Sequence, residues 1–339
     1  MSRPLTRRAF VRGGVAATAL TALPTGLSTS EVAMAEGRRR RRPYLPYGRG
    51  SYFRSGILGS PVDQARTETF RAFMQTHPEQ TWLYPKINGL DGNEWGTAYA
   101  VGRSGMPRWR LVGEHNPKVE RLFARGFHAP EWLGDILTGT DDSPLCVMDR
   151  VSGFTVFCSN AEVAGRHLIR VSSAGITYHS SNGLDHRNPL SNDQRNFTSR
   201  GRISNAMVIR RDLVRHGVRH DTDLGHVLHL FLVETDSSAG FRHPMVGEES
   251  ENYGFGAEGE RLAIDPSVDL TKRGMSPEGL VVARTLQRHG CYIGDNSGSS
   301  SSLKAQQENA VRPLWDRTLR EDSLKGITWD DFVVLEGSG

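Results

Sequence analysis

The feature that most constrains the fold is the apolar run LGHVLHLFLVET at residues 224–235. Valine, leucine and phenylalanine in a run of this length favour a β-strand. The run lacks a clean alternation of apolar and polar residues, which is typical of a strand buried on both faces inside a sheet. It closes a segment, residues 179–236, that is unusually dense in histidine, aspartate, asparagine and arginine. We expect this segment to form the centre of the fold and to carry its functional site.

Strand-like pieces follow one another along the chain, and few segments show a helical period. The expected strands lie at residues 81–87, 94–102, 108–113, 144–149, 154–159, 167–181 (two strands), 224–235 and 329–337. Residues 261–270 are expected to form a strand and a turn, residues 291–302 a strand and a flexible loop, and residues 206–214 a strand or a short helix. Many strands in series without a βαβα alternation indicate a mainly β protein. An antiparallel β-sandwich of jelly-roll type, with a few peripheral helices, fits this pattern best.

Three segments are expected to be helical. Residues 276–290 are the clearest, because Ser276 can cap the helix, Pro277 suits its first position and Gly290 suits its end. Residues 62–76 carry apolar side chains at helical spacing, and residues 117–125 form a shorter candidate.

The first residues have the order of an export signal. Arg7 and Arg8 lie in TRRAFVR, an apolar run of moderate hydropathy follows, and Ala33-Met34-Ala35 offers a cleavage site. The run is too short and too polar to span a bilayer, so no stable membrane insertion is expected. We expect residues 1–35 to direct secretion by the twin-arginine export machinery, residues 36–50 to form a basic, disordered lead-in, and residues 51–339 to form a single β-rich domain.

The basic character of the chain comes from its tail. The formal charge is +4, of which residues 1–36 contribute +2 and the arginine run 38–42 contributes +5, so the remainder carries −3. A mildly acidic body lacks the electrostatic support that nucleic-acid binding requires. We therefore expect no nucleic-acid partner.

Two of the three cysteines can be placed on a hairpin. Cys146 and Cys158 are equidistant from Ser152, so a turn centred there would set them opposite each other. A cross-strand disulfide and two buried free thiols both fit this arrangement. Cys291 would then be unpaired.

The candidate site residues cluster around the central run. His226 and His229 lie three apart, so in a strand they face opposite sides and cannot share one metal ion. At most one of them faces a cleft, and no metal or cofactor is expected. The remaining polar candidates lie in a loop, where sites are often built, or on an extended segment: His179, Asn182, Asp185, His186, Arg200 and Arg202.

Other patterns offer weaker candidates. Asp295 and Asn296 lie on a glycine-flanked segment that can reach the same cleft. The aromatic residues Tyr84, Trp95, Tyr99 and Trp109 fit either a sugar-stacking platform or the core of a sheet. The acidic residues Glu248, Glu249, Glu251, Glu258 and Glu260 fit either a glycosidase pair or a solvated loop.

Six segments carry a family resemblance: SNGLD, SRGRI, LGHVLH, RLAIDPSVDL, HGCYIGDNSG and WDDFVVL. Through them the chain resembles a broad group of secreted actinobacterial proteins that look like β-sandwich, polysaccharide-lyase-like proteins. The resemblance implies that His226, Asp265, Asp269 and Asp295 occupy recurrent positions of the group. It departs from the group's pattern at Val227 and His289. Asp265 and Asp269 flank a proline and are better interpreted as turn caps than as catalysts.

These patterns favour a secreted carbohydrate-active enzyme, with an extracellular polysaccharide as its partner. The leading hypothesis is a lyase that cleaves a uronate-containing polysaccharide by β-elimination. Arg202 and Asn182, with Asp185 and Asp295 nearby, would hold the substrate, His226 or His179 would remove the proton, and Tyr178 or Tyr292 would protonate the leaving oxygen. The alternatives are a non-catalytic glycan or cell-wall binding protein and a glycoside hydrolase.

Overall fold

The fold is organised around a seven-stranded sheet in which the central run forms β11 (Leu228–Leu232). From one edge to the other, the strands are β1 (Val62–Asp63), β15 (Phe332–Leu335), β12 (Arg261–Ile264), β13 (Cys291–Asn296), β11, β14 (Ser302–Lys304) and β2 (Lys86–Asn88). β11 is an interior strand with β13 and β14 as its neighbours, so its predicted central position is confirmed.

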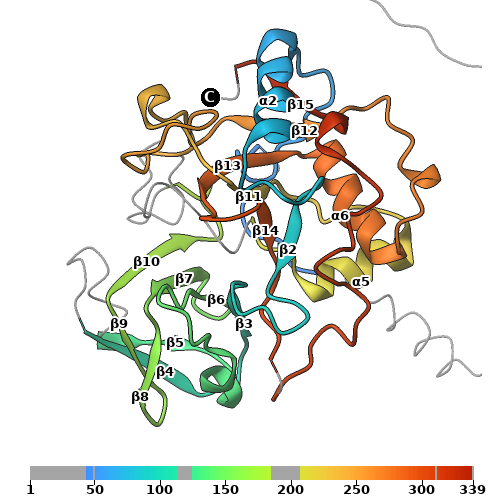
Figure 1. Cartoon of the computed structure of the whole chain (residues 1–339). Coiled ribbons are helices and arrows are strands. Elements are labelled where there is room, and N and C mark those ends of the chain that lie inside the picture. The colour runs from blue at the N-terminus through green and yellow to red at the C-terminus, as the bar shows by residue number, and fades with distance from the viewer. Residues whose placement is uncertain (1–42, 49, 114–123, 185–206, 310, 338–339) are drawn as a thin grey trace, which may run out of the picture. The chain divides into compact units, whose positions relative to one another are not determined.

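The structure is a computed structural model that describes residues 43–48, 50–113, 124–184, 207–309 and 311–337. These residues all belong to one unit, residues 43–339 (Figure 1). The described part is mostly β with few helices, as predicted from the sequence. It contains no helix with the length and hydrophobicity needed to cross a bilayer.

The strand pairing differs from the antiparallel sandwich that the sequence suggested. β11 runs parallel to β13, and β14 runs parallel to β2. Parallel neighbours need crossover connections, and the chain supplies one by inserting β12 and α6 (Pro277–Arg288) between β11 and β13. The large sheet is therefore mixed.

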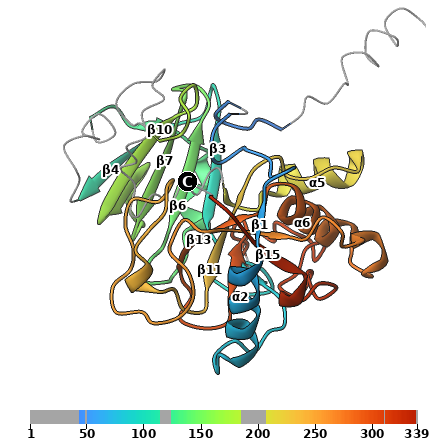
Figure 2. The same ribbon diagram turned by 90° about the horizontal axis from the view of Figure 1, so that it is seen from above.

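Residues 98–178 form two further four-stranded sheets. One has the order β10 (Ser173–Tyr178), β7 (Phe154–Ser159), β6 (Leu145–Asp149) and β3 (Ala98–Gly102). The other has the order β5 (Phe127–His128), β4 (Arg108–Gly113), β9 (Leu168–Val171) and β8 (Glu162–Gly165). Figure 2 shows these strands gathered apart from the helices, with β11 and β13 between the two groups. They share a second apolar core that includes Trp109, Phe127 and Ile169.

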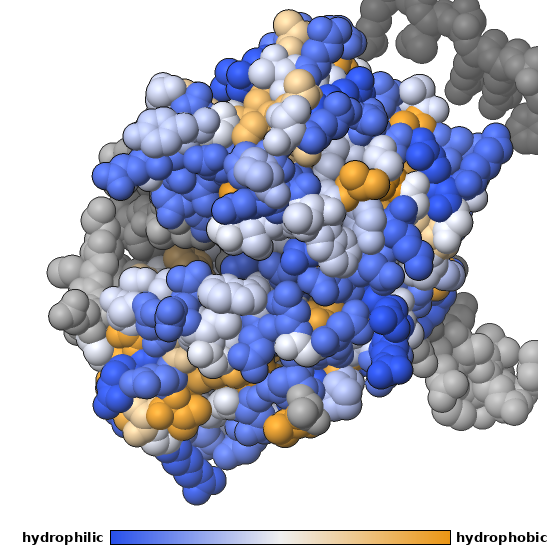
Figure 3. Space-filling view, in the orientation of Figure 1, coloured by the Kyte–Doolittle hydropathy of each residue, from blue (hydrophilic) through white to orange (hydrophobic). Residues whose placement is uncertain are grey.

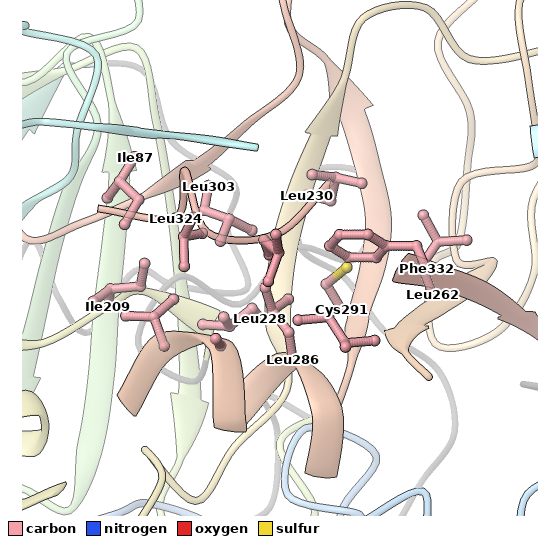
Figure 4. Packing of buried hydrophobic residues seen from close by; sticks show 14 of the residues in the cluster. Ile87, Ile209, Leu228, Leu230, Leu262, Leu286, Cys291, Leu303, Leu324 and Phe332 are labelled. Carbon is pink, nitrogen blue, oxygen red and sulfur yellow. The ribbon is translucent and has the colours of Figure 1, made fainter. Parts of the chain in front are cut away.

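The main core lies between the large sheet and its helices. Alternate residues of β11, Leu228 and Leu230, point to this side together with Ile293 of β13 and Leu286 of α6, and Figure 4 shows several of these side chains in contact. Ser276 caps α6 through a hydrogen bond from the Gly279 amide, as its sequence predicts. The other long helices are α2 (Gln64–Thr76) and α5 (Arg211–His220), and short 3-10 segments occur at Glu131–Ile136 (η2), Ser237–Ala239, Leu270–Lys272 and Trp329–Asp331.

Two segments differ from their predicted form. Residues 81–85 lie outside a strand, and only Lys86–Asn88 pair with β14. Within residues 206–214, Ile209 makes an isolated bridge to Ala305 and α5 follows at once. The predicted helix at 117–125 lies almost wholly outside the described residues.

The cysteine hairpin forms with a register one residue away from the predicted one. Cys158 pairs with Leu145, and Cys146 pairs with Phe157. Because neighbouring residues of a strand face opposite sides, this shift sends the two sulfurs to different faces of the sheet. All three cysteines are buried free thiols, so the disulfide alternative is wrong and the thiol alternative is confirmed.

The folded unit begins before the predicted boundary at residue 51. Tyr47 is buried against Phe53, and its hydroxyl contacts the Thr177 hydroxyl at 2.5 Å. The Tyr44 carbonyl accepts a hydrogen bond from the buried Arg210 guanidinium. Aromatic packing therefore makes residues 43–48 part of the body rather than of a disordered lead-in.

Candidate functional site

A β-bulge in β13 sets the geometry of the site. The register of β11 and β13 shifts between Leu230 and Phe231, which leaves Gly294 as the extra residue opposite them. In an unbroken strand Asp295 would share a face with Ile293 and point into the core. The bulge turns Asp295 to the opposite face, beside Phe231, where it lines a cleft.

The cleft lies over the polar face of the large sheet, where β11, β13 and β14 approach β6 and β7. It encloses about 420 Å³ and adjoins a second cavity of about 460 Å³ with which it shares Asp142, Phe231 and Asp295. Both volumes are within the range of small-molecule sites, roughly 300–1,000 Å³. The lining is rich in carboxylate, amide, imidazole and amine groups, which come from Asp142, His229, Glu249, Asn252, Asp295, Asn296 and Lys304.

Three carboxyl groups converge at this cleft. Oxygen atoms of Glu249, Glu258 and Asp295 lie within 4.8 Å of one another. Glu258 is fully buried and accepts a hydrogen bond from the Glu249 amide at 3.0 Å, while the Glu249 carboxylate accepts one from the Asn296 side chain. Carboxylates this close can share a proton or, as all-oxygen ligands, hold a divalent cation such as Ca²⁺.

An imidazole and an amine face the same cleft. The His229 ring stacks on Phe231 with ring centroids 4.2 Å apart, and Lys304 Nζ lies 4.1 Å from the Phe231 centroid. Gly294 leaves room for this ring, since a Cβ atom there would lie 2.1 Å from His229 Nε2. The glycine of the bulge thus both turns Asp295 toward the cleft and admits His229 to it.

His226 lies away from the cleft. Its side chain is fully buried, and Nδ1 donates a hydrogen bond to the Val227 carbonyl at 2.8 Å. Desolvation lowers the pKa of His226 to about 3, against a partly compensating effect of that hydrogen bond. Of the two histidines, His229 of β11 lines the cleft, whereas His226 lies in the bend before that strand and does not.

The other expected catalytic side chains are also buried outside the cleft. His179 lies against Tyr44 and Thr155, and burial lowers its pKa to about 4. Tyr178 belongs to the second core. Tyr292 is buried, its hydroxyl donates to the Tyr52 carbonyl, and desolvation raises its pKa.

Only one of the four expected substrate-binding residues is seen to line the cleft. Asp295 lines the cleft. Asn182 closes its own turn by accepting a hydrogen bond from the Leu184 amide. Asp185 and Arg202 lie outside the described residues, as do His186 and Arg200, so their roles stay predictions.

The aromatic residues have two different roles. Tyr99 and Trp109 are buried in the cores of their sheets, as the alternative interpretation predicted. Trp95 is 49% exposed and lines the outer cavity beside Lys86 and Asn93. Tyr84 packs against the main core.

Asp265 and Asp269 cap turns, as their sequence context suggested. Asp265 accepts hydrogen bonds from the amide and hydroxyl of Ser267, and Asp269 accepts the same pair from Thr271. These bonds give both residues a structural role. Neither lines the cleft.

The sequence analysis named Glu249 and Glu258 as part of a possible glycosidase pair but favoured a solvated loop, and it chose His226 rather than His229 as the base. The loop at residues 248–260 is glycine-rich, which suggested solvation, yet Glu258 and Glu260 are fully buried. Glu260 forms a two-point ion pair with Arg66. A usable signal was present in β13, where a glycine directly before Asp295 marks a bulge in an otherwise apolar strand.

Comparisons with family models, with curated proteins and with solved structures gave no match. The functional argument therefore depends on the residues of the cleft themselves.

Proposed function

We propose that this protein is an exported enzyme that cleaves a glycan in the cleft formed by β11, β13 and β14. The observation that carries the proposal is the pair of carboxyl groups of Glu249 and Asp295, which face one cleft with oxygens within 4.8 Å of each other. Exposed Trp95 and the amides at its outer end offer a stacking face and hydrogen bonds for a sugar ring.

Hydrolysis suits this arrangement better than elimination. The bases expected for a lyase, His226 and His179, are buried outside the cleft, whereas the carboxylates of a glycosidase are inside it. Oxygen atoms of Glu249 and Asp295 lie within 4.8 Å of each other, which is below the ~6.5–9.5 Å carboxyl separation of inverting glycosidases and therefore favours the retaining class.

In the proposed reaction the two carboxyl groups have distinct roles. Glu249, which accepts a hydrogen bond from Asn296, attacks the anomeric carbon as a carboxylate. Asp295, which is only 8% exposed, gives its proton to the leaving oxygen. The aspartate then takes a proton from water, the water oxygen displaces Glu249 from the sugar, and both residues return to their starting state.

Elimination on a uronate polymer is the second candidate. His229 and Lys304 line the same cleft, and the neutral form of either side chain is a base that removes a proton next to a carboxylate. In this reaction Glu249, Glu258 and Asp295 would hold a divalent cation, which would neutralise the charge of the uronate carboxylate.

The test is a panel of neutral and uronate-containing polysaccharides, each incubated with and without added calcium. We expect new reducing ends without unsaturated product. Rising ultraviolet absorbance from unsaturated ends would show that the enzyme cleaves by elimination and would contradict hydrolysis. Retention on insoluble polymer without any cleavage would instead favour the binding-protein alternative and contradict the enzyme proposal.

We also propose export by the twin-arginine pathway, which TRRAFVR and the following apolar run support. Lysine at both Arg7 and Arg8 keeps the charge but removes the arginine pair. We expect the double variant to stay inside the cell while the unchanged protein reaches the medium, as measured by immunoblotting of both fractions. Equal secretion of the two proteins would contradict this route.

A further inference from the structure

A second pocket, unrelated to the proposed glycan cleft, lies on the other side of the chain segment that follows β14. In Figure 1 this red segment runs between β3 and α5. Gln306 anchors it by donating a hydrogen bond to the Tyr99 carbonyl at 3.0 Å. The pocket encloses about 410 Å³ between β3, η2, the start of α5 and residues 306, 307, 312 and 314.

The body of this pocket is apolar. Val101 and Met106 come from β3 and the turn after it, Trp132 and Ile136 come from η2, and Leu314 closes the opposite wall. Apolar surface of this kind binds the hydrocarbon part of a ligand. Figure 3 shows that the face of the molecule in this view is largely hydrophilic, with apolar residues in small separate patches.

The rim of the pocket is cationic. Four arginines line it, namely Arg103, Arg211, Arg215 and Arg312, against one carboxylate, Asp212. Asp212 is already engaged in a two-point contact with the buried Arg210 guanidinium. Arg211 and Arg215 share Asp316, whereas Arg103 and Arg312 have no ion-pair partner in the described part of the chain.

Arg312 is arranged to bind an anion. Its guanidinium lies 3.9 Å from the centroid of the Trp132 ring. Stacking of this kind occupies the flat face of a guanidinium and leaves its edge N–H donors available for a two-point hydrogen bond to a carboxylate. Trp132 thus holds the charged group over the apolar wall.

We infer that this pocket binds a small organic carboxylate with an apolar body. The carboxylate would take the edge of Arg312, with Arg103 nearby, and the body would lie against Met106, Ile136 and Leu314. The glycan cleft differs in charge, because it is lined by the carboxylates of Asp142, Glu249 and Asp295, whereas this pocket is lined by four arginines and one carboxylate. The inference does not depend on the proposed glycan cleavage.

The test is isothermal titration of the purified protein with 2-naphthoate and with its neutral analogue 2-naphthalenemethanol. We expect the carboxylate to bind at least about tenfold more tightly, because a hydrogen bond to a charged group adds roughly that much affinity. The Arg312→Gln variant should remove this preference. Arg170→Gln is the matched control, since Arg170 is an exposed arginine on β9 that pairs with exposed Glu162.

Each other result overturns the inference. Equal binding of the acid and the alcohol would mean that the arginines play no part, and an unchanged preference in Arg312→Gln would place the anion elsewhere. Loss of 2-naphthoate binding in Lys304→Gln, which removes a cation that lines the glycan cleft, would place the ligand in that cleft. Absence of binding to the wild-type protein would leave the pocket without the proposed ligand class.

Discussion

Asp295→Asn should lower the rate of glycan cleavage by about 10²–10⁴-fold, the usual effect of removing a general acid. The amide keeps the size of the side chain and can still form hydrogen bonds, but its N–H protons are not acidic enough to protonate the leaving oxygen. Glu249→Gln should cause a loss of the same order, since an amide cannot form the glycosyl ester. The measurement is kcat/KM on the best substrate of the panel.

A third variant tests the bulge without removing a carboxylate. Gly294→Ala would place a Cβ 2.1 Å from His229 Nε2, so the ring must leave its position against Phe231. We expect both a strong loss of activity and a stability loss of about 1–3 kcal/mol from overpacking. Glu68→Gln is the matched control for Glu249→Gln, because Glu68 is exposed on α2 and lines neither the glycan cleft nor the arginine-lined pocket.

Wild-type activity in Asp295→Asn or in Glu249→Gln would remove that residue from the reaction. If the alanine variant folded with its stability unchanged and kept full activity, the bulge would not position the site. Loss of activity in Glu68→Gln would point to a general effect of charge rather than to the cleft.

Acidification from pH 7 to pH 5 should destabilise the protein by about 4 kcal/mol through two buried histidines. Burial lowers the pKa of His226 to about 3 and that of His179 to about 4, while an unfolded histidine titrates near 6.5. At a pH between the folded and unfolded pKa values, each of these histidines binds a proton in the unfolded chain but not in the folded chain, so stability falls as pH falls. Each histidine contributes about 2 kcal/mol over this interval.

Carboxylates with lowered pKa act in a different interval. Desolvation opposes the charge of Asp149 and Asp223, but hydrogen bonds from His128 and from His289 and Arg288 outweigh it and keep each pKa below its usual value. Their stabilising effect is lost only as pH falls below about 4. The slope between pH 7 and pH 5 therefore reports mainly on histidines with a lowered pKa, which are His226, His179 and, with a smaller shift caused by partial burial, His243.

The measurement is urea unfolding at both pH values, on variants that keep the native contact but cannot titrate. His226→Asn can retain the donor to the Val227 carbonyl, and His179→Gln can retain the contact with Thr155. Each should remove about half of the pH dependence, whereas His220→Gln, at an exposed position on α5, should leave it intact. An unchanged slope in both core variants would show that other groups set the acid sensitivity.

Local features of the fold could be predicted because they depend on neighbouring residues. Ser276, Pro277 and Gly290 predict the two ends of a helix because each has a strong preference for a position at a helix terminus. The run around Leu230 is apolar on both faces, so its burial inside a sheet does not depend on how it pairs with its neighbours. The hairpin register was missed by one residue because the four-residue turn leaves Asp149 opposite Phe154. The parallel pairing of β11 with β13 depends on a crossover that no local pattern reports.

The site was harder to predict because it depends on long-range placement. His226 and His229 look alike in sequence, but His229 lies within β11 and faces the cleft, whereas His226 lies in the buried bend before that strand. Asp295 was recognised as a candidate, but Glu249 and Glu258 come from a loop whose burial is set by contacts with β13, such as that of Asn296 with Glu249. Composition alone indicated a solvated loop there.

The central claim is that two closely spaced carboxyl groups, Glu249 and Asp295, cleave a glycosidic bond through a covalent intermediate. Proton NMR of the products as they first form tests it most directly, because it reports the configuration at the anomeric carbon. We predict retained configuration in the first sugar released, with cleavage absent in Asp295→Asn. An inverted product, or an unsaturated one, would contradict the account.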